Sequence, residues 1–184
     1  TVVSTDDGPR AGVTLEAVSQ LKPAFRPDGR VTAGNACPLN DGAAAVVVMS
    51  RKRAEELGIT PLARIIASSV SALNPEIMGL GPIEAIKRVL ARADMSMSDI
   101  DLVEINEAFA AQVIPSADEL GIDMVDQLNV NGGAIALGHP FGQTGARIMT
   151  TLLNGLEDSD KTFGLESMCV GGGQGMAMIV ERLK

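Results

Sequence analysis

The sequence contains a single histidine, and that residue stands on a turn where its backbone is restricted on both sides. His139 lies between Gly138 and Pro140, immediately before a predicted helix, so its ring is held on a stiff turn and not on a flexible surface arm. A histidine placed in this way can donate a hydrogen bond or act as a base near neutral pH. The alternative is a structural histidine that caps a loop.

Cys169 is the second candidate for chemistry. It ends a predicted apolar strand, and three glycines at 171 to 173 follow it. Glycines allow the backbone to approach a ligand closely and to offer N–H groups to a developing oxyanion. The alternative is a buried, inert thiol. Only two cysteines are present, Cys37 and Cys169, and they do not form a disulfide framework, so in a reducing compartment each is either a small buried apolar residue or a reactive thiol.

Asn106 follows a predicted buried strand and opens a predicted helix. It is either the N-cap of that helix or a polar group that positions a water molecule. Three glycine-dense or polar segments, at 106 to 112, 131 to 147 and 169 to 175, each lie where a strand ends, which is where open α/β sheets bind ligands. The GxGxxG-like spacing is only weak evidence for a dinucleotide site. One histidine and two distant cysteines do not favour a metal site.

The composition narrows the class of protein. The chain has 184 residues, 46% of them apolar, and a net charge of -8, which argues against nucleic-acid or anionic-membrane partners. No run of about 18 apolar residues suits a transmembrane helix, and the first residues are too polar for a signal peptide, so we expect a cytoplasmic protein. Because Thr1 is not preceded by methionine, we expect a fragment or a processed product.

Hydrophobic periodicity and turn residues predict alternating strands and helices. A helix capped by Thr14 is expected at 14–21, and a helix closed by Gly58 at 51–57. The predicted fold class is α/β, with a mixed sheet covered by helices on both faces and a closing hairpin across the glycines at 171 to 173. Strands are predicted at 43–49, 63–70, 100–105, 129–138, 163–169 and 176–181, and further helices at 82–93, 107–120 and 142–156.

Four segments together resemble signatures of the thiolase family, the acyl-CoA C-acyltransferases, in the family's order and with similar spacing. They are VTAGNACPLNDGAAAVVVMS, DLVEINEAFAAQ, NVNGGAIALGHPFGQTGARI and CVGGGQGMAMIVERL. The resemblance implies a layered α/β/α fold with a mixed five-stranded sheet. Residues 1–30 would be the tail of a loop insertion and 31–184 the carboxyl-terminal domain, whereas the amino-terminal half with the nucleophilic cysteine would lie outside the chain.

The resemblance also implies a two-step reaction, in which a cysteine takes an acyl group from a thioester and passes it to CoA or to an acetyl-CoA carbanion. His139 matches the histidine that activates the nucleophile and helps to bind the thioester oxygen. Cys169 matches the cysteine that moves the proton of the carbon nucleophile. Asn106 matches the asparagine that holds a water in the first oxyanion hole, and the Gly171 N–H matches part of the second.

No tightly bound cofactor is implied, because coenzyme A and acyl-CoA are substrates. Arg10 would meet the nucleotide end of CoA. Cys37 stands where the family often has serine, so a hydrogen bond to pantetheine would be weaker there. Residues implied to line the pantetheine or acyl channel are Phe25, Cys37, Leu39, Met78 and Ala108. The other implied partners are the missing half of the enzyme and copies of itself in a homodimer or homotetramer.

Two alternatives stay open at this point. The chain could be a non-catalytic acyl-CoA-binding or dimerising module derived from a thiolase. A ketoacyl synthase of related fold is disfavoured, because those enzymes generally use paired histidines or a histidine and an asparagine. If the chain is half of a larger body, it should expose the apolar face that the other half covers.

Overall fold

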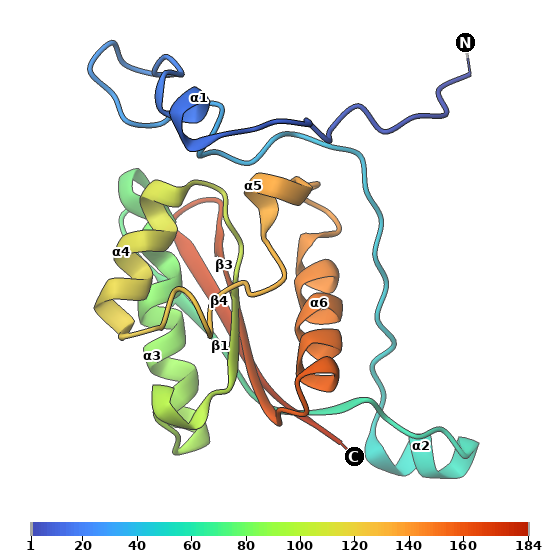
Figure 1. Ribbon diagram of the computed structural model, residues 1–184. Coiled ribbons are helices and arrows are strands. Elements are labelled where there is room, and N and C mark those ends of the chain that lie inside the picture. The colour runs from blue at the N-terminus through green and yellow to red at the C-terminus, as the bar shows by residue number, and fades with distance from the viewer. Residues whose placement is uncertain (1, 184) are drawn as a thin grey trace.

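A mixed four-stranded sheet forms the middle layer of the protein, in a computed structural model that describes residues 2–183 (Figure 1). The strands are β1 (Ala63–Ala72), β2 (Leu102–Ile105), β3 (Phe163–Val170) and β4 (Gln174–Arg182), and their order across the sheet is β1-β4-β3-β2. Strands β2 and β3 run parallel, whereas the β1–β4 and β3–β4 pairs are antiparallel. Parallel neighbours end at the same edge, so the residues that follow β2 and β3 lie together.

Helices cover both faces of the sheet (Figure 1). The helices α3 (Gly81–Ala93) and α4 (Ala110–Leu120) pack on one face, and α6 (Thr144–Asp158) packs on the other. The predicted α/β class with helices on both faces is therefore confirmed. The smaller elements are the helices α1 (Leu15–Ser19), α2 (Arg51–Leu57) and α5 (Ala134–Leu137) and the 3-10 turns η1 (Pro75–Leu80) and η2 (Met97–Asp99).

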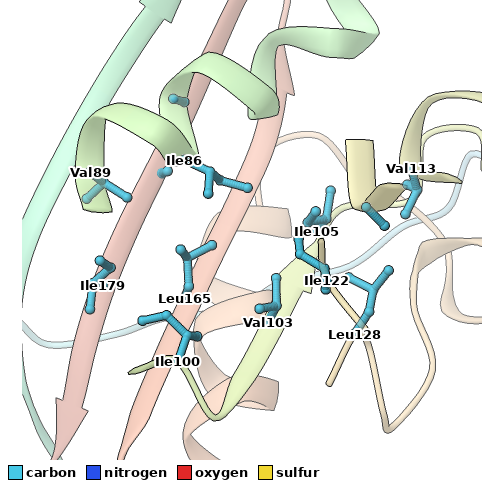
Figure 2. Packing of buried hydrophobic residues seen from close by; sticks show 13 residues of the cluster. Ile86, Val89, Ile100, Val103, Ile105, Val113, Ile122, Leu128, Leu165 and Ile179 are labelled. Carbon is cyan, nitrogen blue, oxygen red and sulfur yellow. The ribbon is translucent and has the colours of Figure 1, made fainter. Parts of the chain in front are cut away.

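The main core lies between the sheet and the α3–α4 layer (Figure 2). Ile86 and Val89 on α3 point toward Leu165 and Ile179 on the central strands, and all four are fully buried. Each such side chain contributes about 1.5–3 kcal/mol by leaving water. A smaller cluster on the opposite face joins α6 to the sheet, and its buried members are Leu102, Leu152, Leu156 and Val180.

Local signals in the sequence predicted several elements correctly. Thr14 accepts a hydrogen bond from Ala17 N at the start of α1, and Gly58 closes α2 in the left-handed conformation. Pro82 lies in the first turn of α3, as expected of a residue that lacks an N–H. The hairpin between β3 and β4 turns through Gly172 and Gly173 at φ of 86° and 87°.

The strand predicted at 43–49 does not form, and the sheet has four strands where five were expected. A strand needs a neighbour that pairs with its backbone, and none of the sheet pairings in the described part of the chain involves this segment. Val47 is 85% exposed, and the segment runs in extended form outside the layers toward α2 (Figure 1). Val46 and Val48 on the same segment are exposed as well, and the expectation that another half of the enzyme covers such apolar residues stays a prediction.

The strand predicted at 129–138 is also wrong. Leu128 forms only an isolated bridge with Val103, and the chain then turns into the short helix α5. The reason is that the side chain of Asn129, and not a strand backbone, pairs with the backbone of Ile105. The Asn129 amide accepts from Ile105 N and donates to Ile105 O, both at 2.9 Å, so the backbone beyond it is free to turn.

The helix predicted from 107 begins at Ala110, because Phe109 forms an isolated bridge with Ala36 and keeps the preceding residues extended. Asn106 therefore is not the N-cap of that helix. Residues 2–50 contain α1 as their one helix in the described part of the chain, and α1 has no buried residue. Within residues 2–183, none of the helices combines the length and apolar character that a bilayer crossing needs.

Candidate active site

The candidate site lies where β2 and β3 end, at the edge that parallel strands share. Asn106 directly follows β2, and its N–H donates to Ser167 O at 3.0 Å. Ser167 precedes Cys169 by two residues, and Cys169 is paired across the hairpin with Gly175. The strand register thus brings the Asn106 loop and the Cys169 hairpin side by side.

The Asn106 side chain is buried without a partner. The residue is 1% exposed, and neither Oδ1 nor Nδ2 has a hydrogen-bond partner within the described chain. Its backbone is satisfied, since the carbonyl accepts from Gln112 Nε2 at 3.1 Å. Leaving a buried amide unpaired costs about 1–3 kcal/mol, so this side chain is suited to bind a water or a ligand oxygen.

A short extended segment joins the Asn106 loop to the histidine turn. Cys37 N donates to Ala108 O at 3.1 Å, and His139 N donates to Pro38 O at 3.2 Å. Gly138 has a φ of 92°, and a Cβ at this position would collide with the Asn40 side chain. Glycine is therefore required beside His139 for both conformational and steric reasons.

The imidazole of His139 is half-buried and held from two sides. Its Nδ1 lies 2.7 Å from Oγ1 of Thr144, and its ring centroid lies 4.8 Å from that of Phe141. Burial lowers the pKa of His139 below its ordinary value, and the positive charge of Arg147 lowers it further. The ring is therefore neutral near neutral pH, which is the form that can accept a proton.

Both thiols are free and half-buried. Burial raises the pKa of Cys169, and the neighbouring Cys37 thiol raises it further. Burial also raises the pKa of Cys37. A thiol with a raised pKa stays protonated near neutral pH, which suits a proton donor and does not suit a nucleophile that must be a thiolate.

The glycine turn after Cys169 is anchored to the opposite edge of the sheet. Leu73 N donates to Gly173 O at 2.8 Å, and a Cβ at Gly175 would collide with the Gly81 carbonyl at the start of α3. Gly171 is exposed, and its carbonyl accepts from Gln174 Nε2 at 3.1 Å. The first turn of α3 therefore packs on the hairpin that carries Cys169.

Two residues that sequence reasoning missed fix the position of the glycine-rich segment. Glu107 accepts from Asn129 Nδ2 at 2.8 Å and from Ile135 N at 3.1 Å. Because Asn129 is also bonded to Ile105, this carboxylate ties the end of β2 to the segment that leads to His139. Glu107 and Asn129 lie in two of the four segments that resemble thiolase signatures, but their spacing in the sequence does not indicate that they contact each other.

A buried charged cluster lies on the α6 face of the sheet. Glu104 and Glu166 are paired across β2 and β3, and Arg147 Nη1 lies 3.8 Å from Glu104 Oε2. Burial raises the pKa of Glu104 to about 7 although Arg147 opposes the shift, and burial together with Glu104 raises the pKa of Glu166 to about 8. Glu166 therefore retains its proton near neutral pH, whereas Glu104 titrates there. Sequence periodicity gave no sign of this cluster.

The predicted channel residues are distributed unevenly. The Cys37 N–H donates a hydrogen bond to the Ala108 carbonyl, close to Asn106 in the chain. Met78 is half-buried in η1. Phe25 touches Phe109 edge to face, with ring centroids 6.1 Å apart. Leu39 is 80% exposed. Arg10 is exposed in the amino-terminal segment, and among the hydrogen bonds described within residues 2–183 none links it to this group.

The site therefore combines a neutral histidine, a protonated thiol and an unpaired amide at the strand ends of an α/β/α fold, an arrangement suited to moving protons at a carbonyl compound. No group of three or more metal-binding side chains occurs among the described residues. Family models for the thiolase carboxyl-terminal domain and amino-terminal domain match residues 59–182 and 1–52, respectively. The chain belongs to the thiolase family, as the resemblance predicted.

Curated relatives agree with this assignment. The chain is 52% identical to acetyl-CoA acetyltransferase from Escherichia coli K12 over 182 residues, which are 99% of this chain and 46% of the relative. It is 50% identical to 3-ketoacyl-CoA thiolase from a Marinomonas species over 185 residues, or 99% and 47% of the two chains. The chain thus spans about half the length of the curated relatives it matches.

Solved structures show the same fold. The acetyl-CoA acetyltransferase of Bacillus anthracis is 51% identical, with a TM-score of 0.94 over 100% of this chain and 46% of its own. Human mitochondrial 3-ketoacyl-CoA thiolase in complex with CoA is 43% identical, with a TM-score of 0.90 over 99% and 46%. The family matches divide the chain between residues 52 and 59, and the boundary that we placed between residues 30 and 31 stays a prediction.

Proposed function

We propose that this chain supplies the acid-base part of an acyl-CoA C-acyltransferase, which cleaves 3-ketoacyl-CoA with CoA or condenses two acetyl-CoA units. One observation carries the proposal. The segment of Cys37 and Pro38 is hydrogen-bonded both to the Asn106 loop and to the His139 turn, and the Asn106 N–H is hydrogen-bonded to Ser167, two residues before Cys169. These contacts support the assignment of a base, an acid and a polar holder for an oxyanion, the three groups that acyl transfer between carbon and sulfur requires, to one site.

The nucleophilic cysteine belongs to the part of the enzyme that corresponds to the remaining half of the relatives. Neither Cys37 nor Cys169 suits that role, because burial raises the pKa of both thiols. His139 takes the proton of that nucleophile and then holds the thioester oxygen. When the bond between the two carbons of a 3-ketoacyl-CoA breaks, the Cys169 thiol protonates the acetyl-CoA carbanion. In the synthetic direction the Cys169 thiolate removes the same proton.

Oxyanion binding is assigned to two places. The Asn106 amide, buried and unpartnered, holds a water that donates to the first oxyanion. The backbone N–H of Gly171, on the glycine turn, donates to the second. Both assignments use donors whose positions are fixed by the sheet, which avoids reorganisation when charge develops.

Coenzyme A is the proposed substrate and no tightly bound cofactor is proposed. Arg10 meets its nucleotide end, while Cys37, Met78 and Ala108 face its pantetheine arm or the acyl group. Phe25 and Leu39 complete the channel, and their exposure supports an open entrance. Among similar structures, human mitochondrial 3-ketoacyl-CoA thiolase is described in complex with CoA.

The remaining proposals concern the whole protein. The exposed valines at 46 to 48 pack against the other half of the enzyme, and the assembled enzyme is a homodimer or homotetramer. We place it in the cytoplasm and in fatty-acid metabolism such as β-oxidation. The length of the relatives, about twice that of this chain, supports a second half.

A chimera tests the proposal directly. This chain replaces the matching carboxyl-terminal segment of the Escherichia coli acetyl-CoA acetyltransferase, and cleavage of acetoacetyl-CoA with CoA is measured for the chimera and for the isolated chain. We expect turnover from the chimera and none from the isolated chain. His139→Ala in the chimera should lower kcat by about 10²–10⁴, the usual contribution of a general base.

Two outcomes would contradict the proposal. Turnover by the isolated chain would place the nucleophile within it. A folded chimera that binds CoA in calorimetry but does not turn over would instead favour the non-catalytic acyl-CoA-binding module.

A further inference from the structure

Thr144 makes two contacts with its one hydroxyl, and the residue is fully buried at the start of α6. Its Oγ1 lies 2.7 Å from Nδ1 of His139 and 3.0 Å from the carbonyl oxygen of Pro140. A threonine hydroxyl has one hydrogen to donate and lone pairs with which to accept. The two contacts therefore need different roles from the same oxygen.

The Pro140 carbonyl decides which role belongs to which contact. A carbonyl oxygen can only accept, so the 3.0 Å contact is favourable only if the Thr144 hydrogen points at it. If that hydrogen pointed at His139, two oxygen lone-pair regions would face each other inside a buried site. With the hydrogen on the carbonyl side, Oγ1 presents a lone pair to Nδ1, and Nδ1 must then carry the proton.

We propose that Thr144 is a positioning residue that holds neutral His139 in the tautomer with its proton on Nδ1. The lone pair then lies on Nε2, which is the only ring nitrogen left to accept a proton. This inference deepens the proposed function and its catalytic meaning rests on that function, because the base must present a free nitrogen to the nucleophile. The tautomer itself is a property of this chain alone.

The rest of the turn supports a fixed ring. Gln143 N also donates to Pro140 O at 3.0 Å, so the carbonyl is held in place by a second donor. The Phe141 ring meets the imidazole at an interplanar angle of 56°. Arg147 lies one helical turn beyond Thr144, and its positive charge favours the neutral imidazole. The proton on Nδ1 thus has a partner, whereas a proton on Nε2 would leave Nδ1 facing a lone pair.

Nitrogen-15 NMR of the chain can read this tautomer without ambiguity, because the sequence has one histidine. The imidazole nitrogen shifts and their long-range couplings to the ring protons are measured at a pH at which the ring is neutral. We expect a protonated Nδ1 and an unprotonated Nε2 in the unsubstituted chain. Thr144→Ser keeps the hydroxyl and should keep this pattern, whereas Thr144→Val should shift the ring toward the Nε2–H form that histidine prefers in water.

The matched control is Thr150→Val on the same helix. Thr150 Oγ1 donates to Ala146 O at 2.8 Å, which is the same bond to the fourth preceding residue, but the side chain is exposed and does not contact the histidine. This variant should leave the imidazole spectrum unchanged. It separates the loss of a threonine hydroxyl bond to a backbone carbonyl from the loss of the contact with His139.

Two results would overturn the inference: a predominantly Nε2–H ring in the unsubstituted chain, or an Nδ1–H ring that persists unchanged in a folded Thr144→Val variant. The first result decides the matter even if Thr144→Val does not fold. An inactive chimera together with an Nδ1–H ring would instead count against the proposed function and leave the tautomer assignment standing.

Discussion

Residues 2–50 and residues 63–183 contain similar apolar side chains, yet they use them in opposite ways. The second region buries its apolar residues between its own sheet and helices, as at Ile86 and Leu165. In the first region no side chain belongs to the described core, and Val46 to Val48 are exposed. Apolar composition therefore does not show where a core forms. Burial depends on whether a partner surface lies within the chain.

The two regions nevertheless meet at the candidate site. Cys37 and Pro38 belong to the exposed region, but their backbones are bonded to Ala108 and His139 in the packed region. The first region therefore shapes the site without supporting the core. This difference predicts that similar substitutions should have very different effects on stability in the two regions.

The largest difference is expected in stability. Leu165→Ala should lower the free energy of unfolding by about 2–5 kcal/mol, because the side chain is fully buried and leaves a cavity. Val47→Ala should change it by no more than about 0.5 kcal/mol, because the side chain is already in water. Urea unfolding of the two variants measures both effects. Similar losses from the two substitutions would contradict the division.

The buried carboxylates of the packed region should make its stability depend on pH. The raised pKa of Glu166, about 8, means that the folded state keeps a proton that the unfolded state releases near 4.5. The stabilisation is fully present below about pH 4.5 and is lost as the pH rises to about 8, by up to about 1.4 kcal/mol per pH unit. Glu166→Gln should remove the part of the slope that Glu166 contributes, leaving the part from Glu104, and should be more stable than the unsubstituted chain at pH 8.

The control for the carboxylate is Glu157→Gln, which changes an exposed glutamate on α6. Unfolding by urea at pH 5, 6.5 and 8 gives the slope for each variant. A slope in Glu166→Gln equal to that in Glu157→Gln would show that Glu166 does not retain its proton.

At the junction between the two regions, stability should depend on Gly138 more than on Gly142. Gly138→Ala places a side chain at positive φ and against Asn40, so it should destabilise the chain by about 1–3 kcal/mol. Gly142→Ala, in the same turn, meets nothing within 4 Å and should have little effect. Thermal unfolding of both variants checks this, and equal shifts in Tm would argue against the contact between residue 138 and the first region.

The smallest effect is expected where the regions touch through aromatic rings. A double-mutant cycle with Phe25→Leu and Phe109→Leu should give a coupling of about 0.5 kcal/mol in the free energy of unfolding, at the low end for such pairs because Phe25 is exposed. A coupling of zero would indicate that the first region is not docked in solution.

Local signals explain the parts of the fold that the sequence predicted. Pro82 marks the first turn of α3, and the glycines after Cys169 mark the hairpin, because both act on the backbone at their own positions. The valines at 46 to 48 have the same local preference as a buried strand, and only the absence of a pairing neighbour in the described chain separates the two. Asn129 misled the prediction for a related reason, since its side chain replaces a backbone partner.

The site shows the same limit. His139, Cys169 and Asn106 could be selected because their residue types and their places beside glycines or strand ends are visible in the sequence. Thr144, Glu107 and Glu166 could not, because their roles come from contacts with residues that are distant or on another element. Reactive side chains can be identified from sequence patterns. The side chains that position them are harder to identify, because their roles depend on contacts between distant parts of the chain.

The most direct test of the account is hydrogen exchange at the acetyl-CoA methyl group, followed by NMR in D₂O with the chimera. The account predicts that the chimera exchanges these hydrogens, faster as the pH rises toward the raised pKa of Cys169, and that Cys169→Ala abolishes the exchange. Exchange in Cys169→Ala at the rate of the unsubstituted chimera would show that Cys169 does not move the proton.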